Sequence, residues 1–189
     1  VSVIVSTYNW PEALEMVLQS LIDQKDRNFE VIVADDGSGP ETANTIIRMQ
    51  KKSPVPIKHF WQEDMGYRLS RVRNGAIKIA EGDIVVFTDG DCCLLPDFVS
   101  NHRKVAEPGC FVTGKRVFLK RRFTEFVMKK RFSFHKWPRI LLFMLGLMGQ
   151  CNRPFQFAPL PQNKKSLWAH QKCWKKAQGC NIAAFRNDI

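Results

Sequence analysis

The residues best suited to chemistry form the short motif Asp89-Gly90-Asp91, which follows an apolar run. Two carboxylates separated by one residue can bind a hard divalent cation through oxygen, and that cation can bridge the phosphates of a diphosphate. Gly90 would allow the backbone to lie close to the ligand. A carboxylate pair without cysteine favours Mn2+ or Mg2+ over zinc. Because Asp-x-Asp is a short motif, a plain Asp-Gly turn with solvated carboxylates is the alternative.

Two further polar clusters follow apolar runs, Ser6-Thr7-Tyr8-Asn9 and Asp35-Asp36-Gly37-Ser38. The ring of Tyr8 could stack on a base while an aspartate accepts a hydrogen bond from a ring nitrogen, which predicts recognition of a uracil-type nucleoside. The Asp35-Asp36 pair could instead be only a cap at the start of a helix. The chain contains neither G-x-G-x-x-G nor G-x-x-x-x-G-K-[ST], which argues against a dinucleotide-binding or P-loop enzyme.

The pattern of apolar residues predicts the elements that must position these clusters. Residues 1–7, 29–34, 57–61 and 83–88 are apolar runs typical of strands, and helical spacing of apolar residues follows each of the first three. Asn9 and Ser70 are the expected N-caps of two helices, with Pro11 in the first turn of one of them. Apolar strands that alternate with helices predict a Rossmann-like α/β fold, its sheet covered on both faces. Ligands bind beyond the carboxyl ends of such strands, so the three clusters should converge.

The bulk composition fits one globular domain, since 44% of the 189 residues are hydrophobic and 25% are charged. A net charge of +11 favours an anionic partner, whether nucleic acid, an acidic lipid surface or a phosphorylated small molecule. No signal peptide is expected, because the chain opens directly on a strand-like run without a charged region or a small-residue cleavage site. No two of its six cysteines have C-x-x-C spacing, so a thiolate metal site is not expected. We expect reduced cysteines that fill the core of a cytoplasmic protein, with a disulfide as the alternative.

A basic and aromatic segment follows, in which residues 103–139 contain twelve Lys or Arg residues against two acids. The apolar stretch at residues 140–148 is about half as long as a bilayer-spanning helix. Basic residues beside Phe, Trp and this stretch predict a peripheral membrane contact through residues 123–149. A covered core helix is the alternative. Nucleic acid is the least favoured partner, because no nucleic-acid-binding motif accompanies the charge.

Several motifs occur together in one order: Val-Ile-Val-Ser-Thr-Tyr-Asn at residues 3–9, Val-Ala-Asp-Asp-Gly-Ser at 33–38, Arg-Asn-Gly-Ala-Ile at 73–77, Glu-Gly-Asp at 81–83 and Asp-Gly-Asp at 89–91. In this order they resemble glycosyltransferase family 2 over residues 1–97, with a weaker match at residues 179–186. The resemblance implies a GT-A fold with a mixed, mostly parallel sheet. It also implies an inverting hexosyltransferase with a nucleotide-diphosphate-sugar donor, usually a UDP-sugar, and Mn2+ or Mg2+ at the Asp-x-Asp motif.

The resemblance assigns expected roles to individual positions. The expected residues are, for the nucleotide, Ser6, Tyr8, Asp35, Asp36, Arg68 and Asp89; for the metal, Asp89 and Asp91; and for the acceptor or donor-sugar side, Gly179 and Asn181. Asp89 would contact either the ribose or the metal. A solvated Arg68 is the alternative to a nucleotide contact. Arg71 and Arg73 are expected on a solvated helix face.

The resemblance also implies how the chain is organised. Residues 1–189 are expected to form a single catalytic domain, truncated at its C-terminal end, in which residues 1–97 bind the nucleotide sugar and residues 98–189 form the acceptor side with its basic aromatic insertion. A carboxylate general base is expected in a Glu-Asp or Asp-Glu element after a segment like residues 179–188. Asp188 matches the aspartate that precedes this element, so the base is expected beyond Ile189.

The function that these features predict is metal-dependent transfer of a sugar to an envelope glycan, such as lipopolysaccharide or capsule, or to a lipid-linked acceptor in a bacterium. A cytoplasmic enzyme that lies peripherally on the inner face of the cell membrane fits the basic segment. A nucleotidyltransferase is one alternative, but it should carry a basic glycine-rich loop near residues 7–11, which this chain lacks. A non-catalytic module that binds anionic lipid or nucleic acid is the other, and it would have no need of the carboxylates.

Overall fold

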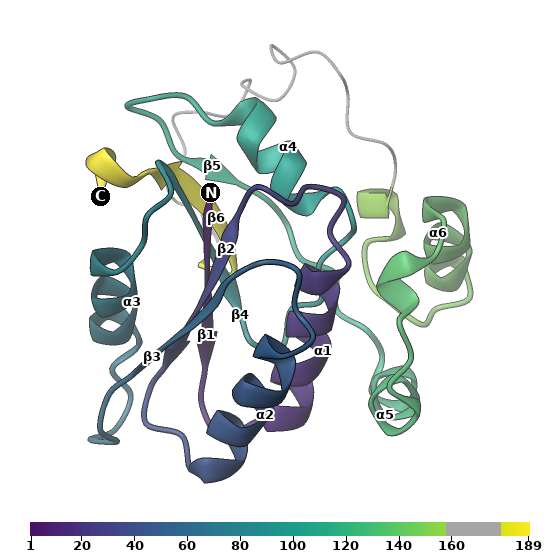
Figure 1. Cartoon of the computed structure of the whole chain (residues 1–189). Coiled ribbons are helices and arrows are strands. Elements are labelled where there is room, and N and C mark those ends of the chain that lie inside the picture. Colours follow the sequence, from purple (N-terminus) through teal and green to yellow (C-terminus); the bar gives the residue numbers. More distant parts are fainter. Residues whose placement is uncertain (158–178) are drawn as a thin grey trace.

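A six-stranded sheet forms the centre of the computed structural model, which describes residues 1–157 and 179–189. The strand order is β3-β2-β1-β4-β6-β5 (Figure 1). The strands are β1 (Ser2–Thr7), β2 (Glu30–Asp35), β3 (Ile57–Trp61), β4 (Ile84–Asp89), β5 (Val112–Thr113) and β6 (Asn181–Phe185). The first four pair in parallel, and β6 pairs antiparallel with both β4 and β5. The predicted mixed, mostly parallel sheet is therefore confirmed.

Helices cover both faces of this sheet, as predicted (Figure 1). Successive side chains of a strand point to opposite faces. Val3 and Val5 of β1 therefore pack in one cluster with α1 (Pro11–Ile22), α2 (Pro40–Gln50) and α4 (Phe98–Val105). Ile4, between them, packs in a second cluster with α3 (Leu69–Lys78) on the other face. Each strand of the sheet centre is thus buried on both sides, which explains its unbroken apolar sequence.

The predicted strands begin and end within one residue of the observed ones, but both predicted N-caps are wrong. Trp10 and Arg68 occupy the N-cap positions of α1 and α3. Asn9 instead adopts a left-handed backbone with φ 46°, and its side-chain oxygen accepts a hydrogen bond of 2.9 Å from Gly39 N. The side chain of Asn9 therefore joins the ends of β1 and β2, an interaction that local capping rules do not anticipate.

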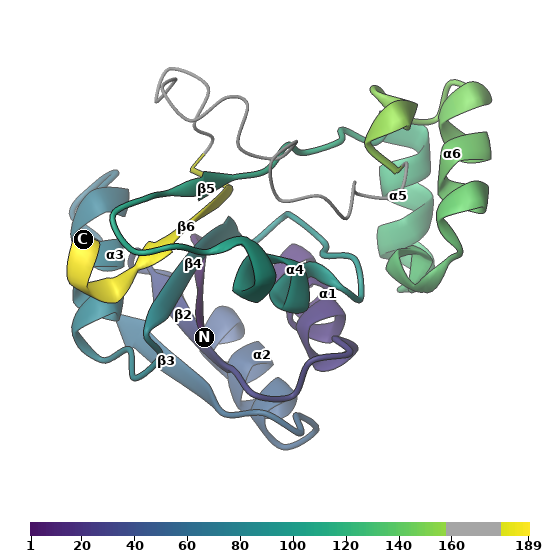
Figure 2. The ribbon, with the colours of Figure 1, turned by 90° about the horizontal axis from the view of Figure 1, so that it is seen from above.

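Residues 121–157, here named the basic segment, form α5 (Arg121–Lys130), η1 (Phe134–Lys136), α6 (Arg139–Leu147) and η2 (Pro154–Phe157). Figures 1 and 2 show α5 and α6 on the α1 side of the molecule, beyond the sheet. Leu142, Cys151 and Phe157 form a third apolar core within this segment. Among the residues described, no helix is both long enough and apolar enough to cross a membrane.

Ion pairs and one histidine hydrogen bond hold the basic segment to the sheet domain. Asp23, which follows α1, accepts from His135 Nε2 and from Lys136 Nζ, each at 2.9 Å. Arg139 lies 2.6 Å from Asp97 at the start of α4. Burial alone would raise the pKa of Asp23, but its hydrogen bonds, chiefly from Lys136 and His135, lower it. These contacts fix where α6 begins relative to α1.

His102 joins α4 to β6 from a buried position. Its Nε2 lies 2.9 Å from the side-chain oxygen of Asn181, which accepts the hydrogen bond. Burial lowers the pKa of His102 to about 4, and the hydrogen bond to Asn181 opposes this shift only in part. His102 is therefore neutral in the folded protein at neutral pH.

The low pKa of His102 predicts a loss of stability in mild acid. Below the ordinary value of 6.5 the unfolded chain binds a proton that the folded chain does not, so the folded state weakens as the pH falls towards about 4. We expect the titration of His102 to lower the free energy of unfolding by up to about 3 kcal/mol. Urea unfolding across this range should show that His102→Gln lacks this component. A constant difference between parent and variant would contradict the assignment.

Candidate functional site

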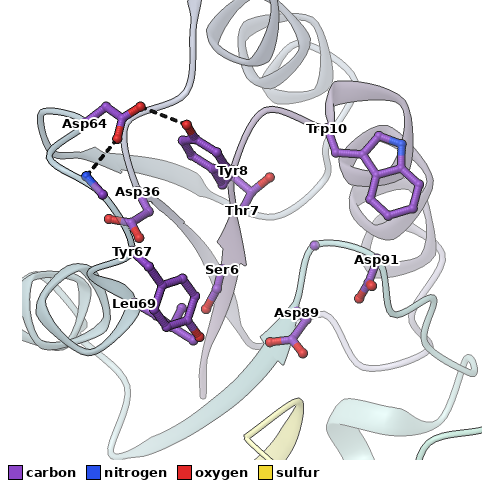
Figure 3. Close-up of a pocket in the computed structure, with 12 residues that line it drawn as sticks. Ser6, Thr7, Tyr8, Trp10, Asp36, Asp64, Tyr67, Leu69, Asp89 and Asp91 are labelled. Carbon is purple, nitrogen blue, oxygen red and sulfur yellow. Dashed lines mark hydrogen bonds between the residues drawn. The ribbon is translucent and has the colours of Figure 1, made fainter.

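Strand register brings the three polar clusters of the sequence to one edge of the sheet. Ser6 lies opposite Asp89 across β1 and β4, and Thr7 lies opposite Asp35 across β1 and β2. A cavity of about 410 Å³ opens at this edge (Figure 3). Its lining residues are Ser6, Thr7, Tyr8, Trp10, Asp36, Asp64, Gly66, Tyr67, Leu69, Asp89, Gly90 and Asp91. The convergence predicted for parallel strand ends is confirmed.

Asp36 is the buried carboxylate of this cavity, and both of its oxygens accept hydrogen bonds. Gln62 Nε2 donates to one oxygen at 2.5 Å, and the backbone N–H of Arg68 donates to the other at 2.8 Å. Asp36 thereby fixes the loop between β3 and α3, which carries Asp64 and Tyr67. A carboxylate has about four acceptor positions, so Asp36 can still accept from a ligand.

Aromatic rings border the cavity at two places. Figure 3 shows Tyr8 and Tyr67 on the Asp36 side and Trp10 beside Asp91. The hydroxyl of Tyr8 donates to Asp64 at 2.8 Å, and this bond raises the pKa of Tyr8 and lowers that of Asp64. Tyr8 and Tyr67 are largely exposed, so each ring presents a face on which a planar group could stack.

The Asp89-Gly90-Asp91 motif forms the end of β4 and the turn that follows it. Gly90 N donates to Ser6 O at 2.7 Å, and a Cβ added at Gly90 would lie only 2.9 Å from that oxygen. The motif thus needs glycine because β1 lies so close. Burial is the main cause of the raised pKa of Asp89, and the negative charge of Asp91 adds to it. Two carboxylates of this kind fit a hard divalent cation, which would relieve their repulsion.

The prediction for Arg73 is wrong, because its side chain does not lie on a solvated face of α3 but binds residues at the edge of the sheet. Its Nε donates to Ser6 Oγ at 2.8 Å, and its Nη2 donates to Asp89 Oδ1 at 2.9 Å and to Gly179 O at 3.1 Å. Arg71 is exposed, as predicted. The two differ because residues two apart on a helix point to opposite sides. The motif at residues 73–77 was the available signal, but it does not show which side faces the sheet.

Two of the predicted nucleotide residues lie outside the cavity lining. Asp35 is fully buried, where it accepts from Ser38 N at 2.8 Å and lies 3.0 Å from His59 Nε2. Arg68 binds Asp36 through its backbone, and its guanidinium donates to the carbonyl of Glu63. Both residues therefore support the cavity through their hydrogen bonds and do not themselves line it. The remaining predicted nucleotide and metal residues all line it.

The predicted acceptor-side residues lie near β6. The carbonyl of Gly179 accepts from Arg73, and the amide oxygen of Asn181 accepts from His102. Asn181 lines a second cavity of about 490 Å³, which shares Trp10 and Asp91 with the first. The second cavity is lined by apolar side chains of both α1 and α5, so it lies between the sheet domain and the basic segment.

The fold and the site together define the class of protein. A mostly parallel sheet with paired carboxylates at its edge, extended by antiparallel β6, is the GT-A fold of glycosyltransferases. Residues 2–170 match the sequence profile described as Glycosyl transferase family 2, and the chain belongs to that family. The resemblance seen in the sequence motifs is confirmed.

Relatives of known activity cover part of the chain. Validoxylamine A glucosyltransferase from Streptomyces hygroscopicus subsp. jinggangensis is 34% identical over 102 residues, which are 53% of this chain and 24% of the relative. The mannosyltransferase PcManGT from Pyrobaculum calidifontis, solved with GDP-Man and Mn2+, is 30% identical with a TM-score of 0.55 over 61% of this chain and 35% of its own. The match thus spans about a quarter and about a third of their lengths.

A more distant structure extends the fold match to nearly the whole chain. Glucosyl-3-phosphoglycerate synthase from Mycobacterium tuberculosis, solved with Mn2+, UDP and glucosyl-3-phosphoglycerate, is 21% identical with a TM-score of 0.52. The match covers 98% of this chain and 56% of that enzyme. At this identity the likeness concerns the fold alone.

The contacts of Arg73 predict a structural cost for its removal. Arg73→Ala would leave Ser6 Oγ and Asp89 Oδ1 without a guanidinium partner, so we expect the free energy of unfolding to fall by about 1 to 3 kcal/mol. Arg71→Ala is the matched control on the exposed side of α3 and should change it by less than about 0.5 kcal/mol. Equal effects of the two substitutions in urea unfolding would refute the bridging role of Arg73.

Proposed function

We propose that this chain transfers a sugar from a nucleotide-diphosphate sugar, with a UDP-sugar as the first candidate, to an acceptor hydroxyl with inversion at the anomeric carbon. The observation that carries the proposal is one cavity lined both by nucleoside-type groups and by a carboxylate pair at the end of β4. Family membership and the GDP-Man and Mn2+ bound by PcManGT support the same class of donor. We also propose an envelope glycan as the acceptor, as predicted from the sequence.

The nucleoside end of the donor lies at Tyr8 and Asp36 in this proposal. The exposed rings of Tyr8 and Tyr67 both border the cavity, and each offers a face on which a base can stack. The free acceptor positions of Asp36 suit a ring N–H, as in uracil. Ser6 and Asp89 lie opposite each other on adjacent strands, where they can bind the ribose or the first phosphate.

The diphosphate end lies at Asp89 and Asp91, which would hold Mn2+ or Mg2+. A bound cation at these carboxylates would neutralise charge on the departing diphosphate. Nη2 of Arg73 lies 2.9 Å from one oxygen of Asp89, and Nη1 of Arg116 lies 3.7 Å from the other. Arg73 holds Asp89 in place, and both guanidinium groups add positive charge where the leaving group develops its own negative charge.

The second cavity supports a lipid-linked acceptor. It meets the donor cavity at Trp10 and Asp91, so a hydroxyl placed there would face the donor. Phe118, Val127 and Met128 contribute apolar lining on the side of the basic segment. The cations of the same lining, Lys115, Arg116 and Arg139, suit the phosphate of a lipid carrier.

The exposed face of α6 supports a peripheral membrane contact, as proposed from the sequence for residues 123–149. Ile140 and Leu147 are 64% and 59% exposed, and Leu141, Met144 and Met148 are exposed with them. Residues 121–153 also contain eight Lys or Arg residues and one acid. Exposed apolar side chains surrounded by cations match an anionic bilayer surface, the inner face of the cell membrane in this proposal.

The role of Asp91 can be tested by nucleotide binding. Asp91→Ala should weaken Mn2+-dependent UDP binding by about 100-fold or more in titration calorimetry, because it removes a metal ligand. Asp83→Ala is the matched control, an exposed aspartate beyond the other end of β4. If Asp91→Ala bound UDP as tightly as Asp83→Ala, with and without Mn2+, the metal assignment would be wrong.

The membrane contact can be tested by vesicle flotation. The parent protein should bind vesicles that contain phosphatidylglycerol, and binding should fall as salt screens the cations. Leu147→Glu should weaken binding by about tenfold or more, because it replaces an inserted apolar side chain with a charge. Ile47→Glu is the matched control, since Ile47 is 50% exposed on α2. Equal binding by the two variants would exclude α6 as the contact.

A further inference from the structure

Two cysteines and an aspartate meet at the end of β4. The thiols of Cys92 and Cys180 and a carboxylate oxygen of Asp89 all lie within 4.8 Å of one another. Cys92 directly follows the Asp-Gly-Asp turn, and Cys180 directly precedes β6. The antiparallel pairing of β4 with β6, in which Thr88 lies opposite Asn181, brings these distant positions together. Neither cysteine forms a disulfide.

The three donor atoms suit a soft divalent cation, unlike the carboxylate pair. Sulfur ligands select zinc-type ions, whereas Mn2+ and Mg2+ prefer oxygen. Two sulfurs on a tetrahedral zinc lie about 3.8 Å apart, given Zn–S bonds of about 2.3 Å. All three donor atoms lie within 4.8 Å of one another, so a single ion can reach them together, and both cysteines are free thiols. The donor types and their convergence therefore indicate a site for a soft cation.

The carboxylate of Asp89 can supply an oxygen without loss of its main partner. Arg73 holds one oxygen at 2.9 Å, but the contact of Arg116 with the other is 3.7 Å long. The side chain of Arg116 is 41% exposed and can move aside. Asp91 also lies close, because the thiol of Cys92 donates to its Oδ1 at 3.3 Å. Water or Asp91 can complete four ligands around the ion.

We propose that Cys92, Cys180 and Asp89 bind a soft divalent cation of the zinc type, with release of the two thiol protons. The bound ion takes Asp89 from the adjacent carboxylate pair, so it excludes the hard cation and the diphosphate that the cation would bind. This inhibitory consequence rests on the proposed function, whereas the binding of the soft cation does not. The site is therefore a point at which thiophilic metals regulate the enzyme.

Binding is tested by titration of Cd2+ into the reduced protein, followed by the ultraviolet charge-transfer absorption of cadmium–thiolate bonds. Cys92→Ser and Cys180→Ser should each weaken Cd2+ binding by roughly 100-fold or more, since loss of even an outer-sphere partner costs about 10- to 100-fold. Cys110→Ser is the control, because Cys110 lies outside the cluster and should leave the affinity unchanged. Circular dichroism establishes that each variant is folded. Equal Cd2+ affinity in all three variants overturns the proposal.

Regulation is tested by Mn2+-dependent UDP binding in the presence of Zn2+. Zn2+ should abolish UDP binding by the parent and by Cys110→Ser, while Cys180→Ser should resist it at the same Zn2+ concentration. Equal inhibition of all three proteins overturns the regulatory role. If the parent fails to bind UDP at all, the proposed function fails, whereas the Cd2+ titration still decides whether the thiol site exists.

Discussion

The parallel pairing of β1 with both β2 and β4 is the constraint on which the rest of the structure depends. Every residue of β1 is buried, and its two hydrogen-bonded neighbours fix which side chains lie opposite one another. Because the three strands run in the same direction, their carboxyl ends supply Ser6, Asp36 and Asp89 to one cavity. The close approach of β1 also explains why glycine separates the two carboxylates of the motif at residues 89–91.

Negative and positive charges are distributed unevenly over the protein. The carboxylate of Asp89 at the sheet edge is balanced by Arg73 and Arg116, which come from α3 and from the segment after β5. The excess of positive charge lies instead on the basic segment, beside the exposed apolar face of α6. In the proposed function, the anionic donor and the anionic bilayer surface are therefore bound at separate places by different cations.

The second cavity lies between the edge of the sheet and the basic segment. It extends from Asp91, at the donor cavity, to the apolar side chains of α5. The hydrogen bond of Asp23 with His135 and its ion pair with Lys136 hold the basic segment against α1. The second cavity thus adjoins both the donor cavity and the basic segment.

The sequence by itself determined the sheet, its central strands and the family, because buried parallel strands impose unbroken apolar runs and the motifs at their ends occur in a fixed order. It also placed Ser6, Tyr8, Asp36, Asp89 and Asp91 at the cavity. It did not determine the position of Arg73, the supporting role of Asp35 or the hydrogen bond between the side chain of Asn9 and Gly39. Those depend on which helix side faces the sheet and on contacts between residues far apart in the chain. The meeting of Cys92 with Cys180 has the same cause: only the pairing of β4 with β6 brings together side chains that no local spacing relates.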